Sequence, residues 1–179
     1  MIRGMTTLSM HAASAPAFAA MLRSMRTWLG HAAGHAAAKG FEPAVLLGMR
    51  LTPDMLPLSK QVQIACDMSK FCIARLSGRE APVHADDETT IEQLQARLAA
   101  VADWIEGVPA GEVDGTEDKS ITMKLRVGET TMPGLVYLRD FATPNFYFHA
   151  TTTYALLRHA GVELGKGDFL GRPRQQKAS

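Results

Sequence analysis

Four long segments of the sequence repeat their apolar residues with the period of an α-helix, and this feature constrains the fold most. They run from about Ser9 to Lys39, from Pro57 to Gly78, from a cap at Thr89 or Thr90 to about Ile105, and from Gly134 to about Ala160. Apolar steps of three and four residues place these side chains on one face of each helix. Four such faces bury each other most simply in an all-α four-helix bundle.

The stretch between the third and fourth segments has a different pattern. ITMKLRVGETTMPG alternates apolar and polar residues around a central glycine. This pattern predicts a small β-hairpin inserted before the last helix. The segments on either side of the second helix are long, which allows a crossover connection. We expect residues 1–171 to form a single domain and the polar, basic residues 172–179 to form a disordered tail.

Charge and cysteine usage exclude several classes of function. The 19 basic and 18 acidic residues give a formal net charge of +1, which gives no broad attraction to nucleic acid. No apolar run approaches the roughly 18 residues that span a bilayer. Cys66 and Cys72 lie six positions apart on one helix and point in different directions, so we expect two buried, unpaired thiols. We therefore expect a cytoplasmic protein with no nucleic-acid or membrane partner.

Three polar residues fall inside the apolar arcs of two helices. On the last helix, Asn145 and His149 lie one turn apart in the middle of the inner face. On the second helix, Gln61 lies within the apolar arc. A buried amide or imidazole without a partner costs about 1–3 kcal/mol, so a side chain, water, metal or ligand must satisfy each group. The pattern predicts a polar pocket, lined by Gln61, Asn145 and His149, that binds a small molecule.

Other polar residues are expected to face solvent. Lys60, Gln63, Asp67 and Lys70 cluster on the opposite side of the second helix. The apolar Phe148, on the last helix, is instead expected on the inner face. His31 and His35, four residues apart, have a spacing that can hold a metal, but they lie beside the apolar stripe of the first helix. HAAGH also lacks the glutamate of a zinc protease motif. We interpret these two histidines as solvated side chains near a helix C-terminus.

Two stretches, LTPDMLPLSKQVQIACDMSKFCIARLSG and PNFYFHATTTYALLRHAGVELGKGDFLG, resemble an uncharacterised bacterial branch of the DinB/YfiT-like superfamily of metalloenzymes. The resemblance covers roughly residues 8 to 171. It implies a four-helix bundle with a long crossover, in agreement with the periodicity. In that superfamily, one histidine on the second helix and two histidines four residues apart on the last helix commonly hold a divalent metal, usually zinc or nickel. Some members transfer low-molecular-weight thiols, and others are hydrolases or isomerases.

The chain departs from that pattern at two of the three ligand positions. His149 matches the second histidine of the last-helix pair, Asn145 replaces the first, and Gln61 lies near the second-helix position. Amides are neutral and bind transition metals poorly, so one imidazole with two amides would hold such an ion weakly. The resemblance therefore implies a cavity in which His149 is either the sole imidazole ligand of a metal or a catalytic general base.

Three functions remain open from the sequence. The first is a small-ligand pocket in which His149 is the catalytic base and the amides orient the substrate. The second is a zinc- or nickel-dependent transferase or hydrolase. The third is a non-catalytic binding module in which the polar cluster only fixes helix register, with a homodimer face marked by aromatics such as Trp104 and Tyr147.

Overall fold

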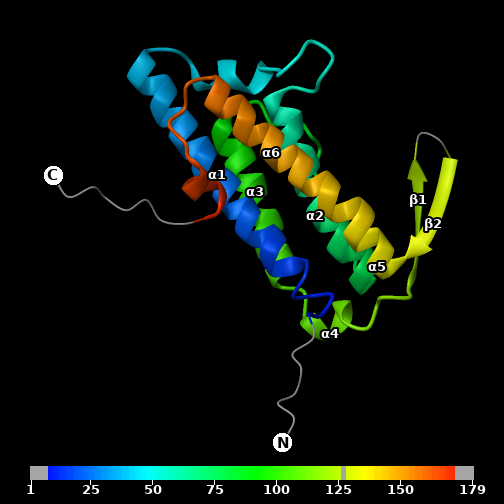
Figure 1. Cartoon of the computed structure of the whole chain (residues 1–179). Helices are drawn as coiled ribbons and strands as arrows, with labels where there is room; N and C mark the ends of the chain where they lie inside the picture. The colour runs from blue at the N-terminus through cyan, green and yellow to red at the C-terminus, as the bar shows by residue number, and fades with distance from the viewer. Residues whose placement is uncertain (1–7, 126–127, 172–179) are drawn as a thin grey trace, which may run out of the picture.

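The computed structural model describes residues 8–125 and 128–171, and within them four long helices form the predicted bundle (Figure 1). These helices are α1 (Ala15–Lys39), α2 (Leu58–Ser77), α3 (Ile91–Glu106) and α6 (Thr143–His159). The shorter elements are the 3₁₀-helix η1 (Pro43–Gly48), α4 (Ala110–Val113), β1 (Ser120–Leu125), β2 (Gly128–Pro133), α5 (Gly134–Val136), the π-helix η2 (Tyr137–Ala142) and α7 (Lys166–Phe169). The all-α bundle with a hairpin before the last helix is confirmed. The expected tail, residues 172–179, lies outside the described residues.

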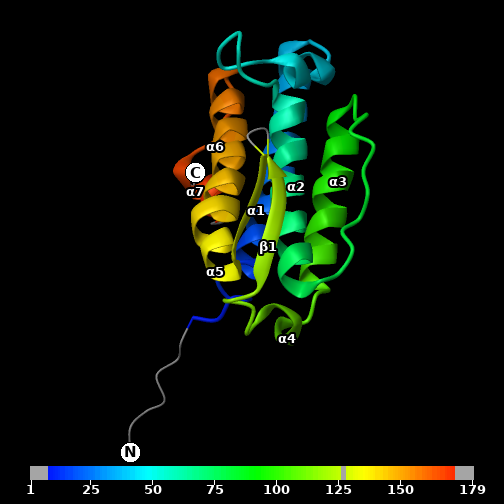
Figure 2. The same cartoon turned by 90° about the vertical axis from the view of Figure 1, so that its right-hand side faces the viewer.

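The helices run up, down, down and up through the bundle (Figures 1 and 2). Helix α1 packs chiefly against α3, and α2 packs chiefly against α6. Because α2 and α3 run in the same direction, the segment between them, residues 78–90, returns along the length of the bundle, beside α3 in Figure 2. This return segment is the crossover connection, and it lies over one face of α2 and α3.

Local sequence signals set the helix ends. Gly40 ends α1 in the left-handed conformation, with φ of 73°, which glycine adopts without steric cost. Thr90 caps α3 in a reciprocal capping box with Gln93, as the sequence predicts. The first helix, however, begins at Ala15 instead of Ser9. Pro16 therefore lies in the first turn, where its missing N–H removes no helical hydrogen bond.

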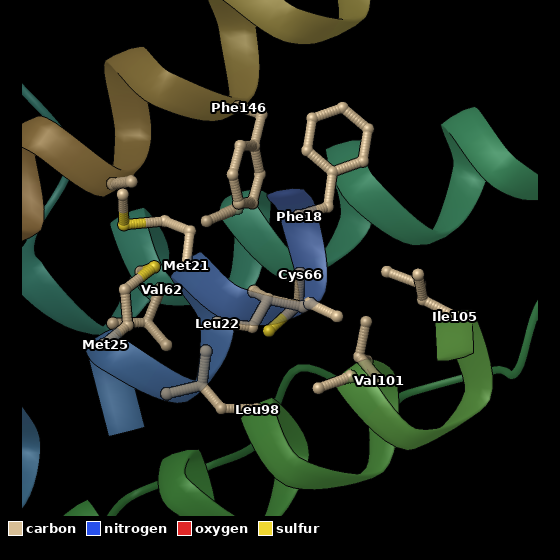
Figure 3. Packing of buried hydrophobic residues seen from close by; sticks show 14 of the residues in the cluster. Phe18, Met21, Leu22, Met25, Val62, Cys66, Leu98, Val101, Ile105 and Phe146 are labelled. Carbon is tan, nitrogen blue, oxygen red and sulfur yellow. The ribbon is translucent and has the colours of Figure 1, made fainter. Parts of the chain in front are cut away.

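The core fills the space between all four long helices (Figure 3). The rings of Phe18 on α1 and Phe146 on α6 pack with their centroids 4.7 Å apart. Leu22 and Cys66 lie beside them and are fully buried. Cys66 and Cys72 are both free and buried, as expected, and burial raises the pKa of each thiol to about 12. Neither thiol is therefore ionised near neutral pH.

The last helical segment is interrupted where the sequence predicts one continuous helix. It divides into α5, the π-helical turn η2 and α6. Pro144, at the start of α6, has no backbone N–H, so the α-helical hydrogen-bond ladder cannot pass through it unbroken. The wider π-turn accommodates this break directly before the residues that form the candidate site. Such turns occur frequently next to functional sites.

Candidate functional site

Gln61 is placed by the first turns of α2, where it points into the interface with α6. Its side chain is almost completely buried, at 1% exposure. The amide nitrogen Nε2 donates a hydrogen bond of 3.0 Å to the backbone oxygen of Leu56 in the loop before α2. That bond fixes the orientation of the amide, because the nitrogen faces the loop and the oxygen Oε1 faces α6.

His149 meets this oxygen from the opposite helix. Its ring nitrogen Nδ1 lies 2.7 Å from Gln61 Oε1. Since an amide oxygen only accepts, Nδ1 carries the proton, and the lone pair of the neutral ring is on Nε2. The ring is partly buried, and the loss of solvation that this causes lowers the pKa of His149. The geometry therefore presents a neutral imidazole with a fixed tautomer.

Asn145 lies one turn before His149 on α6, but it is not hydrogen-bonded to the pair. Its Nδ2 donates a bond of 2.8 Å to the backbone oxygen of Phe141, in the π-helical turn. Its side-chain oxygen remains as an acceptor on the same side of the helix. The structure thus joins Gln61 to His149 directly, and it places Asn145 next to them as a half-buried group held by its own helix.

The surroundings of the pair are apolar and partly open. Leu56 is 45% exposed and Phe148 is 55% exposed. The Phe148 ring stands perpendicular to the His149 ring, with centroids 5.2 Å apart. The prediction that Phe148 faces the interior is wrong, because Phe146 and Ala150 supply the buried centre of α6. His149 therefore lies at the edge of the buried stripe, within reach of solvent.

The donor set does not fit a tightly held zinc or nickel ion. Only His149 supplies a good transition-metal ligand, and one of its nitrogens is engaged with Gln61. Within residues 8–125 and 128–171, no group of three or more His, Cys, Asp or Glu side chains could hold a metal ion. His35 packs against the ring of Phe41 at 6.0 Å, and His31 lines a separate groove.

Two cavities lie away from the Gln61–His149 pair. The larger, of about 950 Å³, is an open groove between α1 and the chain around α7. There the Trp28 ring stacks on Phe169, and its Nε1 donates to the Asp168 backbone oxygen at 3.1 Å. The smaller cavity, of about 430 Å³, lies between the C-terminal half of α2 and the segment that follows it.

A buried cluster of charges between α2, α3 and the return segment was missed by the sequence reasoning. Arg97 on α3 is 3% exposed. It contacts Asp67 on α2 at 2.8 Å and Glu88 on the return segment at 3.0 Å, and it also pairs with Asp86. One guanidinium therefore ties three elements together through charge-assisted hydrogen bonds.

Gln63 and Lys70 belong to the same cluster, so the prediction that both face solvent is wrong. Each is 2% exposed. Lys70 Nζ lies 2.8 Å from Asp67 and donates to His84 Nδ1 at 3.0 Å, and Gln63 donates to Glu88 at 2.7 Å. These residues do lie opposite the bundle core, but the return segment covers them. The acidic run ADDE in that segment could have predicted ion pairs with the basic residues of α2 and α3.

Comparison with known proteins is consistent with this architecture. Residues 10–170 match the family described as Domain of unknown function (DUF1993). The chain belongs to this family. The crystal structure of a DinB family member protein from Shewanella denitrificans is 35% identical, with a TM-score of 0.83 over 94% of this chain and 95% of that one. The DinB-like resemblance and the fold it implies are therefore confirmed. No protein with a curated description matches this DUF1993 chain.

Among the described residues of this DinB-like domain, no helix has the length and apolar character needed to cross a bilayer.

Proposed function

We propose that this DinB-like protein binds a small molecule at the Gln61–His149 pair, and that His149 Nε2 accepts a proton or a hydrogen bond from it. The observation that carries the proposal is the 2.7 Å contact between His149 Nδ1 and Gln61 Oε1. In this contact the protonated Nδ1 donates to Gln61, so the unprotonated Nε2 is the nitrogen available to a ligand. A general base needs such a fixed tautomer and an unprotonated ring near the working pH.

The neighbouring groups define the class of ligand. The lowered pKa of His149 keeps the ring neutral at neutral pH, so it attracts an O–H, N–H or S–H donor. The Asn145 carboxamide lies one turn away and supplies a second acceptor. The exposed ring of Phe148 offers apolar surface beside the imidazole, and Leu56, whose backbone oxygen accepts from Gln61, is also partly exposed. A compact molecule with one proton donor next to an apolar body matches these groups.

Phenol and anisole test the proposal because only phenol carries the O–H donor. We expect phenol to shift the NMR signals of the His149 ring and of the Gln61 and Asn145 side-chain amides in a saturable way. Anisole should shift them much less. The variant His149→Gln should lose the phenol response. The matched variant His35→Gln, which changes a half-buried histidine at another site, should keep it. Equal responses to phenol and anisole would refute the proposal.

A second titration separates this function from a metal-dependent one. The double variant Gln61→His with Asn145→His restores the three-histidine set that the superfamily resemblance implies. Calorimetry with zinc chloride should detect a stoichiometric site in the double variant and only weak binding in the natural sequence, because amides are poor ligands for zinc. Tight one-to-one zinc binding by the natural sequence would favour the metal-dependent function instead.

A further inference from the structure

Arg75, near the end of α2, is a positive charge held in a fixed position by aromatic rings. Its Nη1 donates a hydrogen bond of 2.8 Å to the hydroxyl of Tyr137, which is itself fully buried. The guanidinium carbon lies 5.4 Å from the centroid of the Phe71 ring and 5.6 Å from that of the Tyr137 ring. Both distances are within the range of cation–π attraction. The head group is therefore positioned before any ligand arrives.

No carboxylate neutralises this charge within the described part of the chain. Arg23, Arg79, Arg97 and Arg139 each form an ion pair there, but Arg75 has no Asp or Glu oxygen within 4 Å. A guanidinium has five N–H donors, and the phenolic oxygen of Tyr137 accepts only from Nη1. Arg75 is half-buried, so water solvates its guanidinium less than that of an exposed arginine. Its remaining N–H donors are therefore suited to binding an anionic ligand.

Arg75 lines the shallow, open cavity of about 430 Å³ at the end of α2. Phe71 and Ala74 form its wall on the helix, and Val83, which is 95% exposed, forms the wall on the return segment. The site is open to solvent, and its lining combines apolar side chains with a few charged groups, a combination that small-molecule sites also use. Arg79 also lines the cavity, but its charge is paired with Glu112.

From this arrangement we infer that the cavity binds a small molecule in which a carboxylate adjoins an apolar group. The carboxylate accepts from the planar fork of Arg75, a geometry that suits two parallel hydrogen bonds. The apolar group lies between Phe71 and Val83. Arg75 is fourteen residues beyond Gln61 on the same helix, or roughly 21 Å at 1.5 Å per residue. This anion site is therefore separate from the Gln61–His149 pair and does not depend on its function.

Glu80 provides a second test, in which the expected effect on ligand binding is opposite to that of Arg75. It is exposed and lines the same cavity, so its negative charge repels a bound carboxylate. Removing that charge should strengthen binding, whereas removing the charge of Arg75 should weaken it. A nonspecific apolar site would respond to neither change in this way.

Phenylacetate is the probe, and its binding to the full chain is followed by NMR at low salt. We expect saturable shifts at Phe71, Arg75 and Val83. Arg75→Gln should weaken binding about tenfold or more, since a hydrogen bond to a charged group contributes roughly 1.5–3 kcal/mol. Glu80→Gln should strengthen it by about 1.5- to fivefold, the scale of an exposed charge interaction. The neutral analogue phenylacetamide should bind much more weakly than phenylacetate.

Three outcomes would overturn the inference: shifts that map elsewhere, equal binding of phenylacetamide, or a Glu80→Gln variant that binds phenylacetate no more tightly. The Glu80 variant keeps the test decisive if Arg75→Gln fails to fold, because Glu80 makes no buried contact. Arg75→Lys is a further comparison, since it keeps the charge and loses the planar fork.

Discussion

At the scale of single residues, the protonation state of the His149 ring depends on the chemistry of Gln61, to which its Nδ1 is hydrogen-bonded. Gln61 is neutral, so it orients the ring without supplying a counter-charge to the protonated form, and burial lowers the pKa of the imidazole. A carboxylate in the same place would reverse this balance, because an opposite charge favours the protonated ring.

Gln61→Glu should therefore raise the pKa of His149 above that of the natural sequence. The substituted side chain has nearly the same shape. It loses the hydrogen bond to the Leu56 backbone oxygen but keeps an oxygen next to the ring nitrogen. The measurement is an NMR titration of the His149 ring signals between pH 4 and pH 9 (a range set about the ordinary histidine pKa of about 6.5). His35 provides the control in the same spectra. An unchanged or lower pKa for His149 would show that the two side chains are not in contact.

Arg97→Met should destabilise the protein by up to about 3–5 kcal/mol, because it removes a counter-ion that three partly buried carboxylates share. Asp67, Asp86 and Glu88 would all lose the same partner. Arg23→Met is the matched control: its partners are exposed, and surface pairs contribute about 0–1 kcal/mol. Urea unfolding of both variants measures the difference. Similar losses for the two would argue against a buried cluster.

At the scale of secondary-structure elements, the sequence predicts what local signals encode. Apolar spacing located the four helices, and the Thr90 capping box and Gly40 located two of their ends. The π-turn before α6 was not predicted, because periodicity cannot distinguish a widened turn from a regular one. The buried positions of Gln63 and Lys70 were also missed. The return segment, which is not helical, covers these two side chains. The spacing of apolar residues along a helix cannot predict such a cover.

The junction between β2 and α5 depends on a close backbone approach at Gly134. A Cβ atom added there would lie 2.1 Å from the backbone oxygen of Thr116. Gly134→Ala should therefore cost about 1–3 kcal/mol of stability by forcing this backbone contact apart. Gly111→Ala is the control, since nothing lies within 4 Å of its added Cβ. Thermal unfolding should show a lower midpoint for Gly134→Ala alone, and equal midpoints would contradict the observed packing.

At the scale of the whole molecule, two histidines couple stability to pH. Burial and the nearby Lys70 and Arg97 charges lower the pKa of His84, and burial lowers that of His149. Each histidine is harder to protonate in the folded state than in the unfolded state. Their stabilising contribution is therefore complete above the unfolded pKa of about 6.5 and is lost as pH falls from there through the folded pKa.

We accordingly expect the urea midpoint to fall between about pH 7.5 and pH 5, a window in which ordinary carboxylates stay ionised. The hydrogen bond and charge of Arg97 outweigh the effect of burial and lower the pKa of Asp86, so Asp86 contributes no change in that window. His84→Gln should remove part of the pH dependence by removing the ring that is protonated beside Lys70. A pH-independent midpoint, or an identical profile for His84→Gln, would contradict this coupling.

The pairing of Gln61 with His149 is the basis of the proposed ligand site, and ¹⁵N NMR of the His149 ring in the intact protein at neutral pH tests it most directly. We expect a neutral ring with the proton on Nδ1, the lone pair on Nε2, and a pKa below about 6.5. A ring protonated on Nε2, or one that is charged at neutral pH, would contradict it.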